Sequence, residues 1–555
     1  MLNLQTHPSS PDSSSSTAST IMTFKAKKYL GGSGARLNFF ITVATCTVLA
    51  FYGYDQGVFG GVIIGDPFLE QFDNPDDNVT ATMTSVYNLG CFGGAVATAF
   101  FGDKVGRPRT LILGTSFILV GAIIQSSAYG RAQMFVGRVV AGCGTGINTS
   151  TAGIYQSETA KFASRGKLVV LQMAMCIFGF MLSNWLTFGF SFVNSGAAWR
   201  FPLAFQIVFC SIIYSICPFL PESPRLLVRK GRHEEALDVL SKLAGDNLIP
   251  EDPVVQTQYR SIQEAYELES SFNVTLWDIL CGRGRVGALR RLILGAGMQA
   301  MNQLSGINIT SYYFSYVLIH AVKVETQLAR ILSCAGSVNY LIFSLISYWT
   351  IERFGRRRMM MFSSAGVSMC FMVITISLSF MYKGHDDHAL GICAVFFFFL
   401  FFSLFAIGCL GVPWLYPTEI NTLEVRTKGA AIAAATNWIV NYMVVQVTPP
   451  GVASLGWKFW IVWTTISASF VVWTFFFYPE TANRTLEDID LFFDTEPSYF
   501  IHNNKLATQL TRPQEFIENE KKTRAEAEAQ FAIATADEKE HLKLVEDVQI
   551  SSESV

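Results

Sequence analysis

Two charged side chains stand deep inside apolar stretches of this 555-residue chain, and their types suit proton chemistry. Asp55 lies in FYGYDQGVFGG (51–61), within the apolar run 38–64, and Arg138 lies in GRVVAGCGTG (137–146). A buried carboxylate is a proton site, because loss of water favours its neutral form and a nearby arginine favours its charged form. Protonation would release Arg138 and let the two helices move. The alternative is a static ion pair.

The depths of the two charges predict that they meet. If the first span runs outward and the fourth inward, Asp55 lies about 14 Å and Arg138 about 9 Å from the outer ends of their spans. A lone charge at such a depth costs at least about 2.5–3.5 kcal/mol, so pairing is favoured. The glycines around Asp55 indicate a helix face that packs closely and can move, and they are Gly53, Gly57, Gly60 and Gly61.

A cluster of amides marks a second candidate site, in GMQAMNQLSGINITSYYFSY (297–316). Asn302, Gln303 and Asn308 surround Gly306, which loosens the helix. Amides both donate and accept hydrogen bonds, as a neutral, hydroxylated solute requires. Because buried amides without partners are costly, this spacing predicts a stripe that faces a ligand. The alternative is that they hydrogen-bond neighbouring helices together.

Two tyrosines follow the amides by one helical turn. We expect Tyr312 and Tyr313 to close the site from outside, unless they belong to an aromatic belt at the membrane surface.

Composition places these residues in a membrane protein that has many spans. Half of the chain is hydrophobic and only 15% is charged, against about 25% in soluble domains. The net charge of −2 gives no reason to expect a nucleic-acid partner. The eleven cysteines include no CxxC pair, so we expect packing residues and no metal site or disulfide framework. Without a nucleophile motif, metal cluster or P-loop, we predict neither an enzyme nor an ATP-driven pump, and no cofactor.

Apolar windows of about 20 residues predict twelve membrane-spanning helices. Their ranges are 38–64, 83–102, 110–128, 132–156, 168–190, 200–220, 289–318, 328–351, 360–382, 391–417, 428–448 and 457–478.

The loop charges predict the orientation of these spans. Residues 65–82 carry acidic residues and no Lys or Arg, whereas the loops 103–110, 161–167 and 352–358 are basic. The positive-inside rule places the basic loops, and with them both termini, in the cytosol. The sequon at Asn78 is then extracellular and open to glycosylation.

Three loop signatures occur twice in the same order. Both Glu-to-Arg spacings in the second signature are seven residues. The pairs are Asp103–Arg107 with Glu352–Arg356, Glu158 and Arg165 with Glu419 and Arg426, and Pro221–Arg225 with Pro479–Arg484. The repeat predicts two six-span halves of parallel topology, with a binding site near midplane and alternating access by rocking. We interpret the repeated charges as cytosolic ion-pair latches that hold the inner gate, and the alternative is that they only set topology.

The chain thus divides into five parts. We predict a disordered cytosolic tail (1–37), a first six-helix half (38–220), a cytosolic linker with short amphipathic helices (221–288), a second six-helix half (289–478) and a cytosolic C-terminal tail (479–555).

The signatures DKVGRP, ERFGRRR, PESPR and PETANRTLEDID resemble the sugar porter family of the major facilitator superfamily. GYDQG and TNWIVNYMVV are similar to fungal proton-coupled members, a branch with hexose, pentose and glycerol transporters. The resemblance implies an all-α membrane protein of twelve helices. It also implies that Asp55 and Arg138 couple proton movement to transport, since facilitative relatives tend to carry an uncharged residue in place of the Asp.

The resemblance also assigns substrate-binding residues. These are Gln172, Asn302, Gln303, Asn308, Trp414, Asn437 and, one residue out of register, Asn339. Asn302 stands where the family has Gln, and Ala406 stands where some relatives have Glu. Both departures bear on specificity for hydroxyl groups.

The expected function is therefore proton-coupled symport of a monosaccharide across the plasma membrane by a monomer. A symporter of a polyol such as glycerol is the first alternative. A nutrient sensor that signals through the long C-terminal tail is the second.

Overall fold

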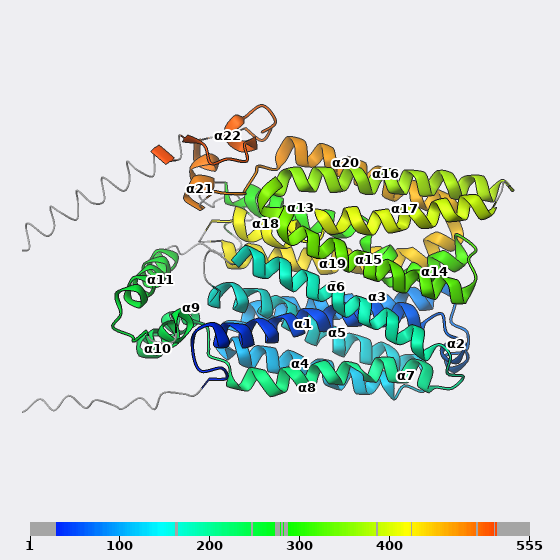
Figure 1. The fold of residues 1–555 in the computed structure, drawn as a ribbon, viewed down its shortest axis with the longest axis horizontal. Helices are drawn as coiled ribbons and strands as arrows, with labels where there is room; N and C mark the ends of the chain where they lie inside the picture. The colour runs from blue at the N-terminus through cyan, green and yellow to red at the C-terminus, as the bar shows by residue number, and fades with distance from the viewer. Residues whose placement is uncertain are drawn as a thin grey trace, which may run out of the picture.

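The computed structural model describes residues 29–518, except 161–164, 246–247, 272–277, 279–280, 282–286, 385–386, 423–424, 485, 496–497 and 515–516. The described residues form helices and connections, with no strand among them. The helices run roughly parallel to one long axis and form two groups that lie side by side (Figure 1).

The first half provides six helical paths across the bundle. They are α1 (Gly34–Val62), α3 (Asp77–Val105), α4 (Arg107–Ser126), α5 (Arg131–Thr159), α6 (Arg165–Phe190) and a sixth path made of α7 (Ala197–Ala204) and α8 (Gln206–Ile216). The short α2 (Asp66–Gln71) lies on the connection between α1 and α3.

The second half repeats this arrangement with two broken paths. They are α13 (Ala288–Leu304) with α14 (Ile307–His320), α15 (Thr326–Phe354), α16 (Arg356–Tyr382), α17 (Asp387–Ile407) with α18 (Val412–Ile420), α19 (Arg426–Leu455) and α20 (Phe459–Phe477).

The remaining helices lie at one end of the bundle, which we call the linker end (Figure 1). The linker holds α9 (Pro224–Arg229), α10 (His233–Ala244) and α11 (Pro253–Ser271), and the C-terminal tail holds α21 (Leu486–Thr495) and α22 (Lys505–Thr508). The opposite end carries α2 and is called the α2 end. The amphipathic helices expected near 232–243 and 262–270 are thus present, whereas the tail segment 521–544 lies outside the described residues.

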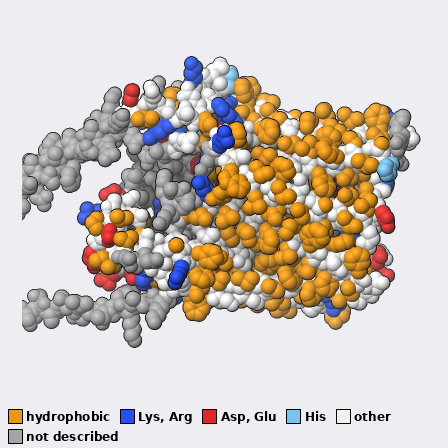
Figure 2. All heavy atoms as spheres, viewed as in Figure 1, with side chains coloured by type: hydrophobic (Ala, Val, Ile, Leu, Met, Phe, Trp, Pro, Cys, Tyr) orange, Lys and Arg blue, Asp and Glu red, His pale blue; other side chains and the backbone are white. Residues whose placement is uncertain are grey.

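A wide band of hydrophobic side chains covers the middle of the bundle (Figure 2). Among the residues that the structure describes, eight stretches are long and apolar enough to cross a membrane, and the last of them joins α19 and α20. The paths α3, α5 and α13–α14 are missing from these eight because they carry more polar residues and glycines. Many of those residues are buried, such as Asn88, Asn148 and Asn308. Polarity inside the bundle therefore explains why hydropathy alone finds fewer spans than the fold contains.

Glycines allow the helices around the centre to approach closely. A Cβ on Gly53 of α1 would overlap the backbone carbonyl of Cys176 on α6, and one on Gly60 would overlap the carbonyl of Tyr312 on α14. Gly306 takes φ +83°, a left-handed conformation that favours glycine, and it divides α13 from α14. This break lies next to the amide cluster.

Candidate substrate and proton sites

The buried charge pair lies between three helices of the first half. Arg138 of α5 places Nη1 3.5 Å from Oδ1 of Asp55 on α1, and both side chains are fully buried. Gln206, at the start of α8, donates from Nε2 to the same carboxylate oxygen at 2.9 Å. The break between α7 and α8 therefore contributes a third member that the sequence gave no reason to select.

Arg138 has more hydrogen-bond and aromatic partners than Asp55 has, and one oxygen of Asp55 remains without a partner in the described part of the chain. Arg138 also donates to the backbone carbonyls of Met83 and Thr84, and its guanidinium stacks over Phe59 and Tyr87 at 4.3 and 4.5 Å from the ring centroids. In contrast, Oδ2 of Asp55 has no hydrogen-bond partner among the described residues. A carboxylate with one free oxygen can accept a proton there without first breaking a hydrogen bond.

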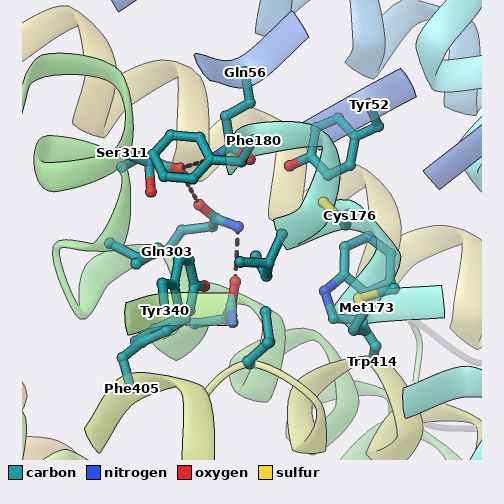
Figure 3. A pocket seen from close by; sticks show the side chains of 15 residues that line it. Tyr52, Gln56, Met173, Cys176, Phe180, Gln303, Ser311, Tyr340, Phe405 and Trp414 are labelled. Carbon is teal, nitrogen blue, oxygen red and sulfur yellow. Dashed lines mark hydrogen bonds between the residues drawn. The ribbon is translucent and has the colours of Figure 1, made fainter. Parts of the chain in front are cut away.

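A central cavity of about 450 Å³, partly open to solvent, lies between the two halves. Most of its polar wall comes from the second half, with Gln56 of α1 as the exception, and aromatic rings line much of the remainder (Figure 3). The lining residues include Tyr52, Gln56, Phe180, Asn302, Gln303, Asn308, Ser311, Tyr340, Phe405 and Trp414.

The amides of this wall form one hydrogen-bonded chain. Gln56 of α1 donates to Oδ1 of Asn308 at 2.5 Å, and Asn308 donates to Gln303. Gln303 donates in turn to Oδ1 of Asn437 at 2.6 Å and to Oδ1 of Asn302 at 2.8 Å. Because each amide fixes the next, the chain presents its remaining donors and acceptors to the cavity in a defined orientation. Gln56 links this wall to the helix that carries Asp55.

The other residues assigned by resemblance take different positions. Trp414 lines the cavity, whereas Asn437 lies behind Gln303 and holds it. Gln172 is buried and does not line the cavity, and no described residue forms a hydrogen bond with its Nε2. Asn339 also does not line the cavity, because its amide donates to the carbonyl of Phe399 and to Ser403 on α17.

Sequence reasoning missed several residues of the cavity. Gln56 stands one position after Asp55, so the motif GYDQG contained the signal. Tyr340 lines the cavity in place of its neighbour Asn339, and Phe405 does so beside Ala406. Asn441, one turn after Asn437, accepts a hydrogen bond from Asn308 at 2.8 Å.

Tyr312 and Tyr313 lie inside the bundle and are fully buried, so they are not part of an aromatic belt facing lipid. Tyr312 donates to Asn88 of α3 at 3.3 Å, and Tyr313 donates to the carbonyl of Val445 on α19 at 3.3 Å. Tyr312 therefore bridges the two halves on the α2 side of the amide wall.

The repeated charges form a network at the linker end of the first half. Arg107 binds both oxygens of Glu158 at 3.1 Å and Asp103 at 2.8 Å. Glu222 accepts the backbone N–H groups of Arg107 and Ser223, and so satisfies the start of α4. Burial raises the pKa of Glu222, while these two N–H groups act in the opposite direction.

The second half repeats this network. Arg356 binds Glu419 at 2.7 and 3.2 Å, and Glu480 accepts the backbone N–H of Arg356 at 2.8 Å. Gly106 and Gly355 have φ of +104° and +81°, and a Cβ at either would overlap the carboxylate of Glu222 or Glu480.

Each network joins residues of a single half, and the role of these ion pairs as latches of the inner gate stays a prediction. The side chains of Arg165, Glu352 and Arg426 lie outside the described residues.

Comparisons with known proteins agree with this fold. Residues 40–493 match the family model described as "Sugar (and other) transporter". The chain is 45% identical over 527 residues to the MFS-type transporter oryC of Aspergillus oryzae, covering 94% of this chain and 96% of that protein. It is 35% identical over 476 residues to the sugar transporter STL1 of Saccharomyces cerevisiae, covering 83% and 82%.

A solved structure shares the fold. The proton:xylose symporter XylE, bound to 6-bromo-6-deoxy-D-glucose, superposes with a TM-score of 0.70 at 20% identity, covering 82% of this chain and 99% of that one. The chain therefore belongs to the sugar transporter family of the major facilitator superfamily.

Proposed function

We propose that this protein is a proton-coupled symporter of a monosaccharide, working by alternating access in the plasma membrane. The observation that carries the proposal is the buried pair of Asp55 and Arg138, in which one carboxylate oxygen has no hydrogen-bond partner within the described part of the chain. The basic loops at the linker end support a cytosolic position for that end and for both termini. The α2 end then faces outside, and we call it the outer end.

In the proposed cycle, a proton from outside binds Asp55 and weakens its hold on Arg138. The guanidinium keeps its carbonyl and aromatic partners, so it does not become an isolated buried charge. The sugar binds the amide wall, and Gln56 connects the wall to α1 through Asn308. Binding of both solutes therefore acts on the same helix, and return of the proton to the cytosol resets the pair.

A polyol such as glycerol remains the second candidate substrate. Asn302 is shorter than the Gln of related transporters, and its amide nitrogen is committed to the carbonyl of Cys409 at 2.5 Å. The wall therefore offers one donor fewer at this position, which suits a solute with fewer hydroxyl groups.

The test of coupling is Asp55→Asn in a cell that lacks its own transporters. An amide cannot carry the proton, so uphill accumulation should be lost while downhill flux or exchange persists. Uptake of glucose, xylose, galactose, glycerol and sorbitol, recorded together with external pH, measures both the substrate and the coupling.

The matched control is Asp73→Asn, the same substitution at an exposed position near the outer end. It should accumulate substrate normally. Undiminished accumulation by Asp55→Asn would refute coupling through this residue. Uptake of none of the five solutes by the unaltered, surface-expressed chain would instead support the sensor alternative.

A further inference from the structure

Arg330, in the second turn of α15, crosses from the second half to the end of α1. Its Nη1 donates to the carbonyl of Gly61 and its Nη2 to that of Ile64, each at 3.3 Å. The last carbonyls of a helix have no partners within the helix, and this end carries partial negative charge. Arg330 therefore supplies a cationic cap to the outer end of α1 from the opposite half.

Within the described part of the chain, these two carbonyls are the only hydrogen-bond partners of the Arg330 guanidinium. Its side chain is 92% buried, since 8% is exposed, and Nε has no hydrogen-bond partner among the described residues. It faces a small cavity whose other lining residues are uncharged, namely Gly61, Asn184, Thr187, Phe188, Ser315 and Ser333. Asp66 attracts the guanidinium but forms no ion pair with it. The hydrogen bonds of this cation thus depend on the position of α1.

We propose that Arg330 is the positioning residue that holds the outer gate closed. The contact exists only while the end of α1 stays within reach of the Arg330 side chain, so it must break when the halves separate at the outer end. Gly61 follows Asp55 by six residues, which is about 9 Å along α1. The helix that carries Asp55 therefore also carries the carbonyl of Gly61 that Arg330 binds. The inference rests on the proposed alternating-access transport.

A second arginine near the outer end, Arg131, binds two backbone carbonyls in the same way and serves as a matched control. Arg131, at the start of α5, donates from Nε to the carbonyl of Phe72 at 2.9 Å and from Nη2 to that of Asp73 at 3.1 Å. This guanidinium also binds two backbone carbonyls near the outer end, but all three residues belong to the first half. Its contacts need not break when the halves separate.

The experiment measures how often the outer end opens. Ser315→Cys places a thiol in the small cavity, where the native serine is 7% exposed. A membrane-impermeant thiol reagent, added to intact cells, labels this cysteine only while the outer end is open. The parent chain without the added cysteine gives the background. Surface expression is measured for every variant.

Adding Arg330→Gln should increase the labelling rate about tenfold, which corresponds to about 1.4 kcal/mol. Adding Arg131→Gln should leave the rate unchanged, and Arg330→Lys should restore part of the closure because Lys also donates to carbonyls. Substrate uptake by Arg330→Gln should show a lower maximal rate, with a smaller effect on KM.

An unchanged labelling rate in surface-expressed Arg330→Gln, or an equal rise in Arg131→Gln, would overturn the inference. If Arg330→Gln fails to reach the surface, the labelling rate of Arg330→Lys is compared with that of the Ser315→Cys chain alone. A higher rate supports the inference, and an unchanged rate overturns it. Labelling needs neither a proton gradient nor a substrate. Failure of the symport proposal would therefore leave this result intact and show itself only in the uptake assay.

Discussion

At the scale of single residues, the buried charges and the amides that line the cavity lie largely in different halves of the protein. Asp55, Arg138 and Gln206 lie within the first half, and most of the amides that line the cavity lie in the second. Gln56 is the exception, because it reaches from α1 to Asn308. A single side chain therefore connects the residue proposed to bind the proton with the wall proposed to bind the sugar.

Gln303 is the centre of the amide wall, so its loss should weaken substrate binding. Gln303→Ala removes donors to Asn302 and Asn437, and we expect KM to rise about tenfold, as for the loss of one hydrogen bond of about 1.4 kcal/mol. The measurement is the concentration dependence of uptake at equal surface expression.

The control is Asn339→Ala, a similar truncation on α15 whose amide faces α17 and not the cavity. Its KM should stay close to that of the parent. Normal affinity of Gln303→Ala for every transported solute would remove this wall from the substrate site.

At the scale of elements, breaks and close contacts position the functional side chains. The break at Gly306 lies between Gln303 and Asn308, and across it Asn308 donates a hydrogen bond to Gln303. Glycines on α1 bring it against α6 and α14 without intervening side chains. Such backbone contact is typical of helices that pack in membranes through small residues.

Gly53→Ala should therefore destabilise the protein by about 1–3 kcal/mol, the usual cost of overpacking. The added methyl group would meet the backbone carbonyl of Cys176, which cannot move without shifting α6. The measurement is the apparent melting temperature in detergent. Gly93→Ala is the control, since a Cβ on this glycine of α3 meets nothing within 4 Å. A melting temperature for Gly53→Ala equal to that of Gly93→Ala would refute the packing argument.

At the scale of the whole molecule, the start of the C-terminal tail is part of the second half. Ile501 donates its N–H to the carbonyl of Phe476 at 2.9 Å, and Ala507 accepts the N–H of Glu480 at 2.8 Å. Arg512 binds both carboxylate oxygens of Asp488 at 2.7 and 2.8 Å. Because Glu480 also caps α16, the tail supports the charge network at the linker end.

Ile501→Asp tests whether this tail segment stabilises the fold. The native side chain is 1% exposed, so an unpaired carboxylate there should cost about 2 kcal/mol or more and lower the apparent melting temperature. Asn503→Asp introduces the same charge two residues away at an exposed position, and should have little effect. Equal melting temperatures for the two variants would show that the tail contributes nothing to stability.

The sequence by itself indicated the properties that depend on local composition. Apolar length predicted the helical paths, and the repeated signatures predicted the two parallel halves. The cost of isolated charges predicted that Asp55 and Arg138 approach each other, and the structure brings them into contact. These inferences rest on the apolar length of each segment, on the repeat in the sequence and on the free-energy cost of burying a lone charge. All three can be read from the sequence without knowing which residues are neighbours in space.

Only the tertiary structure decided which partners those residues have. Adjacent residues on a helix point about 100° apart, so Tyr340 lines the cavity while Asn339 faces α17. The same limit concealed Gln206 beside Asp55 and the cap that Arg330 gives to α1. Composition reports that a side chain will be buried, but the rotation and contact of whole helices determine what it meets there.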